Sequence, residues 1–169
     1  GGNGNDTLIG GLGDDTLDGG NGTDLASYVG ATDAITVDLG AGSSAGAHGN
    51  DSLTGIENVL GGYGDDSLVG DGNANTLHGF QGDDTLLGGE GADSLYGGNG
   101  SNSIEGNGGD DSLTGGAGGD NTLDGGEGTD WLTPVADSQY VFADLRTGEY
   151  VDVSPLGRVI NIENVLGSN

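Results

Sequence analysis

Apolar residues recur every nine positions along most of the chain, and the residues between them are mostly small or polar. Each recurring residue is the eighth of a nine-residue phrase, with three phrases over residues 1–27 and eight over 61–133. The recurring residues are Leu8, Leu17, Leu68, Leu77, Leu86, Leu95, Ile104, Leu113, Leu123 and Leu132. A fixed period of this length is typical of repeat architectures. One apolar residue per phrase predicts one inward-facing side chain per phrase.

The pattern divides each phrase into a turn and a strand. Positions 1, 2 and 4 are mostly glycine, which accepts a positive φ, so the first six residues are predicted to form a tight turn. Asn73, which replaces the glycine of position 4, also tolerates that conformation. Positions 7 to 9 predict a three-residue strand. Because a strand with one apolar residue cannot form a core alone, the strands must stack in parallel. We therefore predict an all-β solenoid with two phrases per coil and coils ~4.8 Å apart.

Residues 28–60 interrupt the phrases, and we predict that they form wider coils of the same solenoid. The segment 35–39 alternates apolar and polar residues, as a half-buried strand does, and residues 55–60 predict a further strand. Between them, residues 46–54 form another phrase, with Asp51 at position 6.

A longer period supports this interpretation. Residues 19–63 align with 125–169 at an offset of 106, and Ile56–Gly61 recurs unchanged at Ile162–Gly167. The whole chain, 1–169, is thus predicted to be a single array. Its parts are the first repeats (1–27), a wider segment (28–60), the main run (61–133) and a second wider segment (134–169, with wider coils over 134–166). We expect the chain to be a fragment of a longer array.

Stacking brings like charges together. With two phrases per coil, Asp66 lies next to Asp84 on one edge, and Asp93, Asp111 and Asp130 lie in line on the other. Two carboxylates about 5 Å apart repel by roughly 3 kcal/mol at an effective dielectric constant near 20. The chain has 28 Asp and Glu against two Arg, which both lie outside the repeats, and a formal net charge of −26. A bound cation is therefore expected. Carboxylates and turn carbonyls, with no Cys and two isolated His, favour Ca²⁺ over Mg²⁺.

The phrases GGNGNDTLI, GGLGDDTLD and GGEGADSLY resemble the RTX, or haemolysin-type, calcium-binding nonapeptide GGxGxDxUx. The resemblance implies a right-handed parallel β-roll in which position-6 carboxylates and turn carbonyls of adjacent coils share several Ca²⁺ ions. The implied carboxylate ligands are Asp6, Asp15, Asp24, Asp66, Asp84, Asp93, Asp111 and Asp130, and the phrase at 46–54 adds Asp51. Weaker ligation is expected at Asn75, at Asn102, and in the ten-residue phrase that contains Asp120 and Asn121. The implied carbonyl ligands are Gly2, Gly4, Gly11, Gly13, Gly62, Gly64, Gly79, Gly82, Gly89, Gly91, Gly98 and Gly100.

Composition and resemblance together indicate function. Low hydrophobicity (31%) and high net charge are typical of a chain that is disordered without its metal. The family implies a module of a secreted bacterial protein that passes unfolded through the type I secretion apparatus and folds on meeting external calcium. Such a module supports the secretion and stability of neighbouring domains. We expect the module to be non-catalytic, whether or not its parent protein is an enzyme. Nucleic acid is excluded as a partner by charge, and no apolar run is long enough to insert into a membrane.

The alternative is a carbohydrate- or surface-binding β-solenoid of an adhesin or polysaccharide-modifying enzyme. A regular outward stripe of aromatic or Thr side chains would favour this alternative. The outward residues at position 9 (Val69, His78, Leu87, Tyr96, Glu105, Thr114) are expected to form no such stripe. His48 and His78 are predicted to be surface residues, and Trp131 a packing residue at the end of the array.

Overall fold

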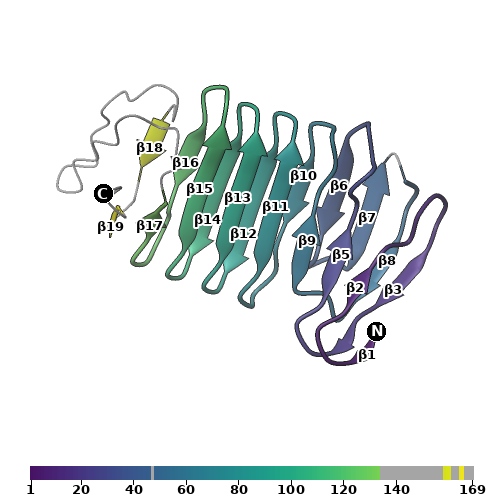
Figure 1. Cartoon of the computed structure of the whole chain (residues 1–169). Coiled ribbons are helices and arrows are strands. Elements are labelled where there is room, and N and C mark those ends of the chain that lie inside the picture. The colour runs from purple at the N-terminus through teal and green to yellow at the C-terminus, as the bar shows by residue number, and fades with distance from the viewer. Residues whose placement is uncertain (47, 134–157, 161–163, 166–169) are drawn as a thin grey trace.

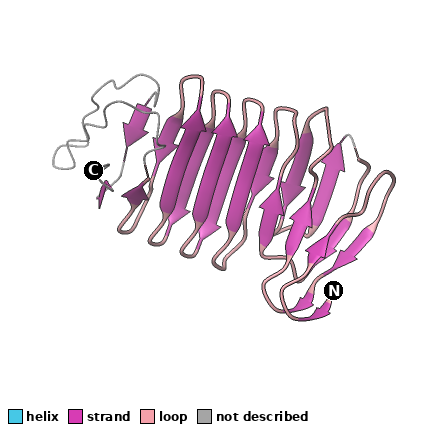
Figure 2. Ribbon diagram, in the orientation of Figure 1, coloured by secondary structure: helices cyan, strands magenta, loops and turns pink. Residues whose placement is uncertain are grey.

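Each Thr-Leu-x or Ser-Leu-x triplet forms a strand with its central residue buried, as the nine-residue period predicts. The computed structural model describes residues 1–46 and 48–133, and the backbone of two strands, Arg158–Ile160 and Asn164–Val165. All of the described regular structure is β, and the strands stack along one axis (Figures 1 and 2). No helix that could span a membrane occurs in this part of the chain. The second wider segment, predicted at 134–166, lies outside the described residues except for these two strands.

Successive phrases contribute to two facing sheets in turn. An eight-stranded sheet has the order β19 (Asn164–Val165), β17 (Trp131–Leu132), β15 (Ser112–Ala117), β13 (Ser94–Asn99), β11 (Thr76–Gln81), β9 (Asn58–Leu60), β5 (Leu25–Ser27), β2 (Thr7–Leu8). A nine-stranded sheet has the order β18 (Arg158–Ile160), β16 (Thr122–Asp124), β14 (Ser103–Gly108), β12 (Thr85–Glu90), β10 (Ser67–Val69), β6 (Ile35–Asp38), β7 (Ser43–Gly46), β8 (Ser52–Thr54), β3 (Thr16–Asp18). Two short strands, β1 (Gly2–Asn3) and β4 (Gly20–Asn21), pair separately.

The register confirms two phrases per coil. Leu68 pairs with Leu86 and Leu77 with Leu95, each eighteen residues apart, and the pairing is parallel. After the ten-residue phrase the offset becomes nineteen, so Leu113 pairs with Leu132. The strands β11 to β15 have six residues rather than the predicted three, because positions 1 to 3 of the following phrase also pair with the next coil. These features establish a parallel β-solenoid that fits a β-roll.

The core is a narrow double row of apolar side chains between the two sheets. The position-8 residues from Leu68 to Leu132 are at most 1% exposed. Their neighbours at positions 7 and 9 point away from this core, as the alternation of a strand requires. Leu86, for example, is fully buried, whereas the next residue, Leu87, is only half-buried on the outer face.

The segment 28–60 closes one long coil, but it contains an antiparallel insertion that the sequence did not predict. Strand β5 pairs with β9, so this coil begins and ends in register within the eight-stranded sheet. Between them, β7 runs antiparallel to both β6 and β8, within an otherwise parallel sheet. The polar, glycine-rich sequence of β7, Ser-Ser-Ala-Gly, gives no apolar period from which to predict a strand. The predicted strand at 35–39 is confirmed as β6.

The longer period is visible in the strand pairing. Strand β16 pairs with β18 as β3 pairs with β8, and β17 pairs with β19 as β5 pairs with β9. The paired positions differ by the offset of 106 that the sequence shows. The described strands of the second copy therefore take the places of their counterparts in the first.

We expect the inward and outward leucines of one strand to differ sharply in their contribution to stability. Replacing Leu86 by Ala removes a fully buried side chain from a core to which each strand contributes one such residue. It should lower the free energy of unfolding by about 2–5 kcal/mol. Leu87→Ala is the matched control and should cost about 1 kcal/mol or less. Chemical denaturation in millimolar Ca²⁺ measures both values. Equal losses would contradict the inward assignment of position 8.

Candidate metal centre

The position-6 residues form two ladders, one along each edge of the roll where the turns lie. On the first edge they precede the strands of the eight-stranded sheet, and on the second they precede those of the nine-stranded sheet. The backbone N–H of most position-6 residues donates a hydrogen bond to a side-chain oxygen of position 6 in the next coil, as Asp66 does to Asp84 Oδ1 (2.8 Å). Asp93 donates likewise to Asp111 (2.8 Å), and Asp111 to Asp130 (2.9 Å). The predicted stacking of these acids is therefore confirmed.

The ladders are buried, although most of their members are acidic. Asp24, Asp66, Asp84, Asp93, Asp111 and Asp130 are at most 2% exposed. Asn75, Asn102 and Asn121 occupy equivalent places and are at most 3% exposed. Burying a carboxylate is costly unless it is paired with a cation or fully hydrogen-bonded.

Most of these carboxylates retain one oxygen for which the described residues provide no donor. The Oδ2 atoms of Asp6, Asp15, Asp24, Asp84, Asp93 and Asp111 are buried without a hydrogen-bond partner in the described part of the chain. Asp66 differs, because its two oxygens accept hydrogen bonds from the backbone N–H groups of Ile35 and Gly62 (3.0 and 2.6 Å). Buried acceptors of this kind are where a cation would be expected.

The electrostatic cost appears in the pKa values of the buried acids. Burial raises the pKa of Asp84 to about 7, although the N–H of Asp66 lowers it in part and nearby carboxylates raise it further. Burial likewise raises the pKa of Asp93 to about 6, and it also raises the pKa of Asp66 and of Asp111. Negative charge is thus disfavoured at these positions in the protein alone, and a cation beside them would reverse the effect.

Glycine at position 1 makes the space beside each carboxylate. A Cβ added to Gly79 would lie 2.1 Å from Asp84 Oδ2 and 2.6 Å from the carbonyl oxygen of Gly97 in the next coil. The same arrangement recurs at Gly61, Gly88 and Gly106, each with its own position-6 carboxylate and a carbonyl of the next coil. Each coil thus presents a carboxylate oxygen and a carbonyl oxygen around a space that a side chain would fill.

This role of position 1 differs from the one expected from sequence. Positive φ occurs mainly at positions 2 and 4, as in Gly89 and Gly91, whereas the position-1 glycines do not adopt it. Gly62, Gly64 and Asn73 also lack the predicted positive φ. Among the glycines predicted as carbonyl ligands, Gly79 is the one at position 1. The carbonyl of Gly62, at position 2, instead accepts a hydrogen bond from the N–H of Gln81 (3.2 Å).

Oxygen donors from side chains alone do not complete a site. No three His, Cys, Asp or Glu side chains converge within residues 1–46 and 48–133. Each edge supplies at most one position-6 carboxylate per coil, so backbone carbonyls must provide the remaining ligands. A donor set of carboxylate and carbonyl oxygens suits Ca²⁺, which accepts six to eight oxygens in flexible geometry.

Asp51 occupies a ladder position but has a different environment. Its Oδ1 accepts the N–H of Asp15 (3.0 Å), as the other position-6 residues accept that of the preceding coil. Its Oδ2 accepts hydrogen bonds from Tyr28 Oη (3.1 Å) and Ser44 Oγ (3.0 Å). Burial raises the pKa of Tyr28 to about 12, so its hydroxyl stays protonated and remains a donor. Asp51 therefore lacks the unpartnered oxygen that the other acids offer to a cation.

The ten-residue phrase resolves the choice between Asp120 and Asn121. Asn121 is buried and accepts the N–H of Asn102 (2.8 Å), so it occupies the ladder position. Asp120 is exposed, and its N–H donates to Ser101 Oγ (3.2 Å). Asp120 therefore lies outside the ladder, because the extra residue of this phrase lies in the turn, and weaker ligation in this phrase stays a prediction.

Sequence analysis missed Glu57, which continues the first ladder. Its Oε2 accepts the N–H of Asp24 (2.8 Å), and its carbonyl accepts Asn75 Nδ2 (2.9 Å). Glu57 lies outside a glycine-rich phrase, so the motif gave no signal for it. Counting two residues back from Val59, which pairs with Leu77, would have placed it at position 6.

A third, exposed set of side chains lies at position 5. Asp65 accepts the N–H of Asp83 (2.8 Å), and Asp83 accepts that of Ser101 (2.7 Å). These bonds run opposite in direction to those of the position-6 ladders. The motif leaves position 5 unspecified, so sequence reasoning could not assign it this role.

We expect a methyl group at Gly79 to weaken calcium binding. Gly79→Ala would fill the space between Asp84 Oδ2 and the Gly97 carbonyl, and should raise the calcium concentration at the folding midpoint several-fold. Gly72→Ala is the matched control, because a Cβ there meets no atom within 4 Å and needs no positive φ. Calcium titration followed by circular dichroism measures both midpoints. A shift of the same size in both variants would show that the exchange of glycine for alanine itself, and not the filling of the calcium site, changes the midpoint.

Comparison with known proteins agrees with this geometry. None of the curated proteins matches the chain. The RTX calcium-binding nonapeptide repeat matches it in four copies, over residues 1–26, 60–95, 87–121 and 116–133, which together cover more than half of the sequence. The chain therefore belongs to the RTX calcium-binding nonapeptide repeat family and is a calcium-binding repeat module.

Proposed function

We propose that this module belongs to a secreted bacterial protein and folds when it binds Ca²⁺ outside the cell, so that it supports the secretion and stability of a larger exported chain. The observation that carries the proposal is the pair of buried carboxylate ladders, whose Oδ2 atoms lie beside carbonyl oxygens. The repeats contain no basic residue that could neutralise them. Calcium is the missing counter-charge.

Folding and metal binding are coupled in this proposal. Without calcium the ladders place buried like charges one coil apart, and the core has one apolar side chain per strand to offset the cost. With calcium, the energy of binding adds directly to the stability of the roll, because the oxygens come together only in the folded state. A low intracellular calcium concentration would keep the chain unfolded for passage through a type I secretion channel, and external calcium would then fold it.

We propose Asp6, Asp15, Asp24, Asp84, Asp93 and Asp111 as carboxylate ligands, with position-1 carbonyls of the adjacent coil. Asp66, Asp130, Glu57 and the amides Asn75, Asn102 and Asn121 continue the ladders at equivalent positions. The acids are thus distributed along both edges of the roll, which suits repeated cation binding rather than a single catalytic centre. We accordingly propose that the module itself is non-catalytic and serves neighbouring domains of the parent protein.

Calcium should control the folding of the isolated module. We expect circular dichroism to show a disordered chain in EDTA and β-structure in millimolar Ca²⁺, with Mg²⁺ ineffective at the same concentration because it requires near-ideal octahedral geometry. A cooperative thermal transition in EDTA equal to that in calcium would refute the proposal.

The acids with an unpartnered oxygen should contribute more to calcium affinity than an acid whose oxygens are both satisfied, such as Asp51. Asp111→Asn keeps the Oδ1 acceptor of the ladder but removes the charge, and should raise the calcium midpoint several-fold. Asp51→Asn makes the same change at a carboxylate already bound by Tyr28 and Ser44, and should shift the midpoint much less. Titration of both variants measures the difference. Equal shifts would mean that Asp51 ligates calcium as the other acids do.

A further inference from the structure

The outer face of the eight-stranded sheet carries an aromatic stripe that the linear sequence hides. Consecutive phrases enter different sheets, so the position-9 residues separate into two columns. In one column His78 pairs with Tyr96, and Tyr96 with Thr114, on the adjacent strands β11, β13 and β15. The expectation that position 9 forms no aromatic or Thr stripe was therefore wrong for this sheet.

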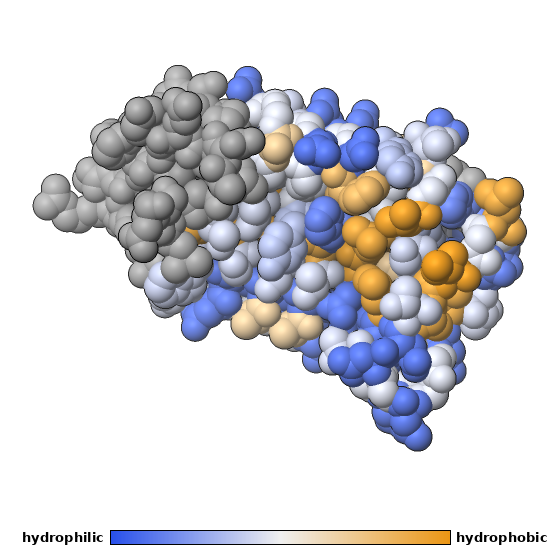
Figure 3. All heavy atoms as spheres, in the orientation of Figure 1, coloured by the Kyte–Doolittle hydropathy of each residue, from blue (hydrophilic) through white to orange (hydrophobic). Residues whose placement is uncertain are grey.

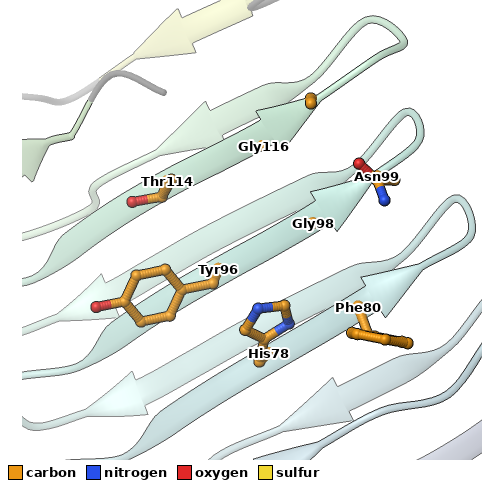
Figure 4. Close-up of a pocket in the computed structure, with 8 residues that line it drawn as sticks. His78, Phe80, Tyr96, Gly98, Asn99, Thr114 and Gly116 are labelled. Carbon is orange, nitrogen blue, oxygen red and sulfur yellow. The ribbon is translucent and has the colours of Figure 1, made fainter. Parts of the chain in front are cut away.

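Phe80 and Tyr63 extend the stripe into a cluster. The rings of His78 and Tyr96 stack with centroids 5.9 Å apart, Phe80 lies 6.2 Å from His78, and Tyr63 meets Phe80 edge-on at 5.3 Å. Figure 4 shows His78 between Phe80, on its own strand β11, and Tyr96, on the neighbouring strand β13. His78, Phe80 and Tyr96 line an open groove of about 360 Å³ that continues to Asn99 and Thr114, and Tyr63 packs against Phe80 beside it. In the space-filling view, hydrophobic side chains gather on one part of the visible face, and hydrophilic ones lie along its margins (Figure 3).

Phe80 has a backbone conformation that is unfavourable for a residue with a bulky side chain. It occupies position 2 of its phrase, where most other phrases have glycine, and its φ is +84°. The equivalent Gly89 and Gly98 have φ values of +110° and +102°. A bulky side chain rarely adopts this conformation, and such strain often marks a functional site. Phe80 is also absent from the hydrophobic core, so packing there does not account for it.

Two polar atoms at the groove have no partner in the described part of the chain. Thr114 is only 9% exposed, and its Oγ1 makes no hydrogen bond there; the same holds for His78 Nδ1. The groove thus combines aromatic rings with hydrogen-bonding groups, and none of the residues that line it is Asp, Glu, Lys or Arg.

We propose that this groove binds a neutral oligosaccharide laid along the axis of the roll. The C–H faces of sugar rings are weakly positive and stack on the negative faces of aromatic rings, while their hydroxyls pair with groups such as Thr114 Oγ1 and Asn99. Adjacent strands repeat every ~4.8 Å, which presents successive side chains to successive sugar units. Acidic polysaccharides are disfavoured by the net charge of −26. The proposal requires the folded roll and does not depend on the route of secretion.

Titration of the calcium-loaded chain with cellohexaose, maltohexaose and laminarihexaose tests the proposal, with binding followed by calorimetry. Oligogalacturonate and choline serve as acidic and cationic probes. We expect at least one neutral hexasaccharide to bind. Phe80→Gly restores the glycine usual at position 2, so it should leave the calcium midpoint unchanged or lower it, yet weaken saccharide binding by about tenfold or more.

Tyr96→Thr should weaken saccharide binding similarly, because it removes the ring that stacks on His78. Its matched control is Glu105→Thr, at position 9 of the other sheet, which should bind as the parent chain does. The proposal is overturned if no neutral hexasaccharide binds, if only oligogalacturonate or choline binds, or if Phe80→Gly and Tyr96→Thr retain the parent affinity. Normal calcium-induced folding alongside any of these results would leave the proposed calcium function intact.

Discussion

The structure depends on a carboxylate that is buried at the same place in successive coils. One of its oxygens accepts the backbone N–H of the coil before, as Asp111 accepts that of Asp93, and thereby fixes the spacing and register of the stack. Its other oxygen faces the space left by a position-1 glycine. The same side chain therefore contributes to the backbone hydrogen bonding of the roll and makes the roll unstable without a cation. An amide, as at Asn102, keeps the first role and loses the negative charge.

This arrangement explains why so small an apolar core is sufficient. A strand contributes one fully buried residue such as Leu95, and much of the remaining interior consists of backbone and ladder side chains. The unfolded chain would keep its charges in water, so burial of the ladders opposes folding until the charge is neutralised. Ladder residues whose oxygens are all satisfied within the protein escape this dependence. Asp51, held by Tyr28 and Ser44, is such a residue, and it lies beside the antiparallel strand β7 where the regular stacking is interrupted.

The sequence predicted the parts of the fold that repeat, and it failed where the chain departs from the repeat. Period, register and the inward position 8 follow from the spacing of residues such as Leu68 and Leu86, because one geometry must satisfy every phrase. Strand β7 and Glu57 could not be found this way, since neither belongs to a nonapeptide and both are defined by their partners in space. The role of position 1 was missed for a related reason. A motif shows that glycine is required at a position. Only the three-dimensional structure shows whether the reason is a positive φ or a neighbouring group that leaves no space for a side chain.

On the outer face of the roll the sequence is less restricted than in the turns and the core. Metal binding restricts the turn positions, and packing restricts the core positions. Position 9 lies outside both the calcium ladders and the core, so its residue can vary with little loss of stability. Residues that nevertheless gather there, such as His78 and Tyr96, are brought side by side only when the coils stack. Phe80 departs further from the repeat, because it replaces the usual glycine at the end of β11 and takes a positive φ that is unfavourable for its side chain. A surface assembled from separate phrases exists only in the folded roll, so whatever binds to it binds a chain that calcium has already ordered.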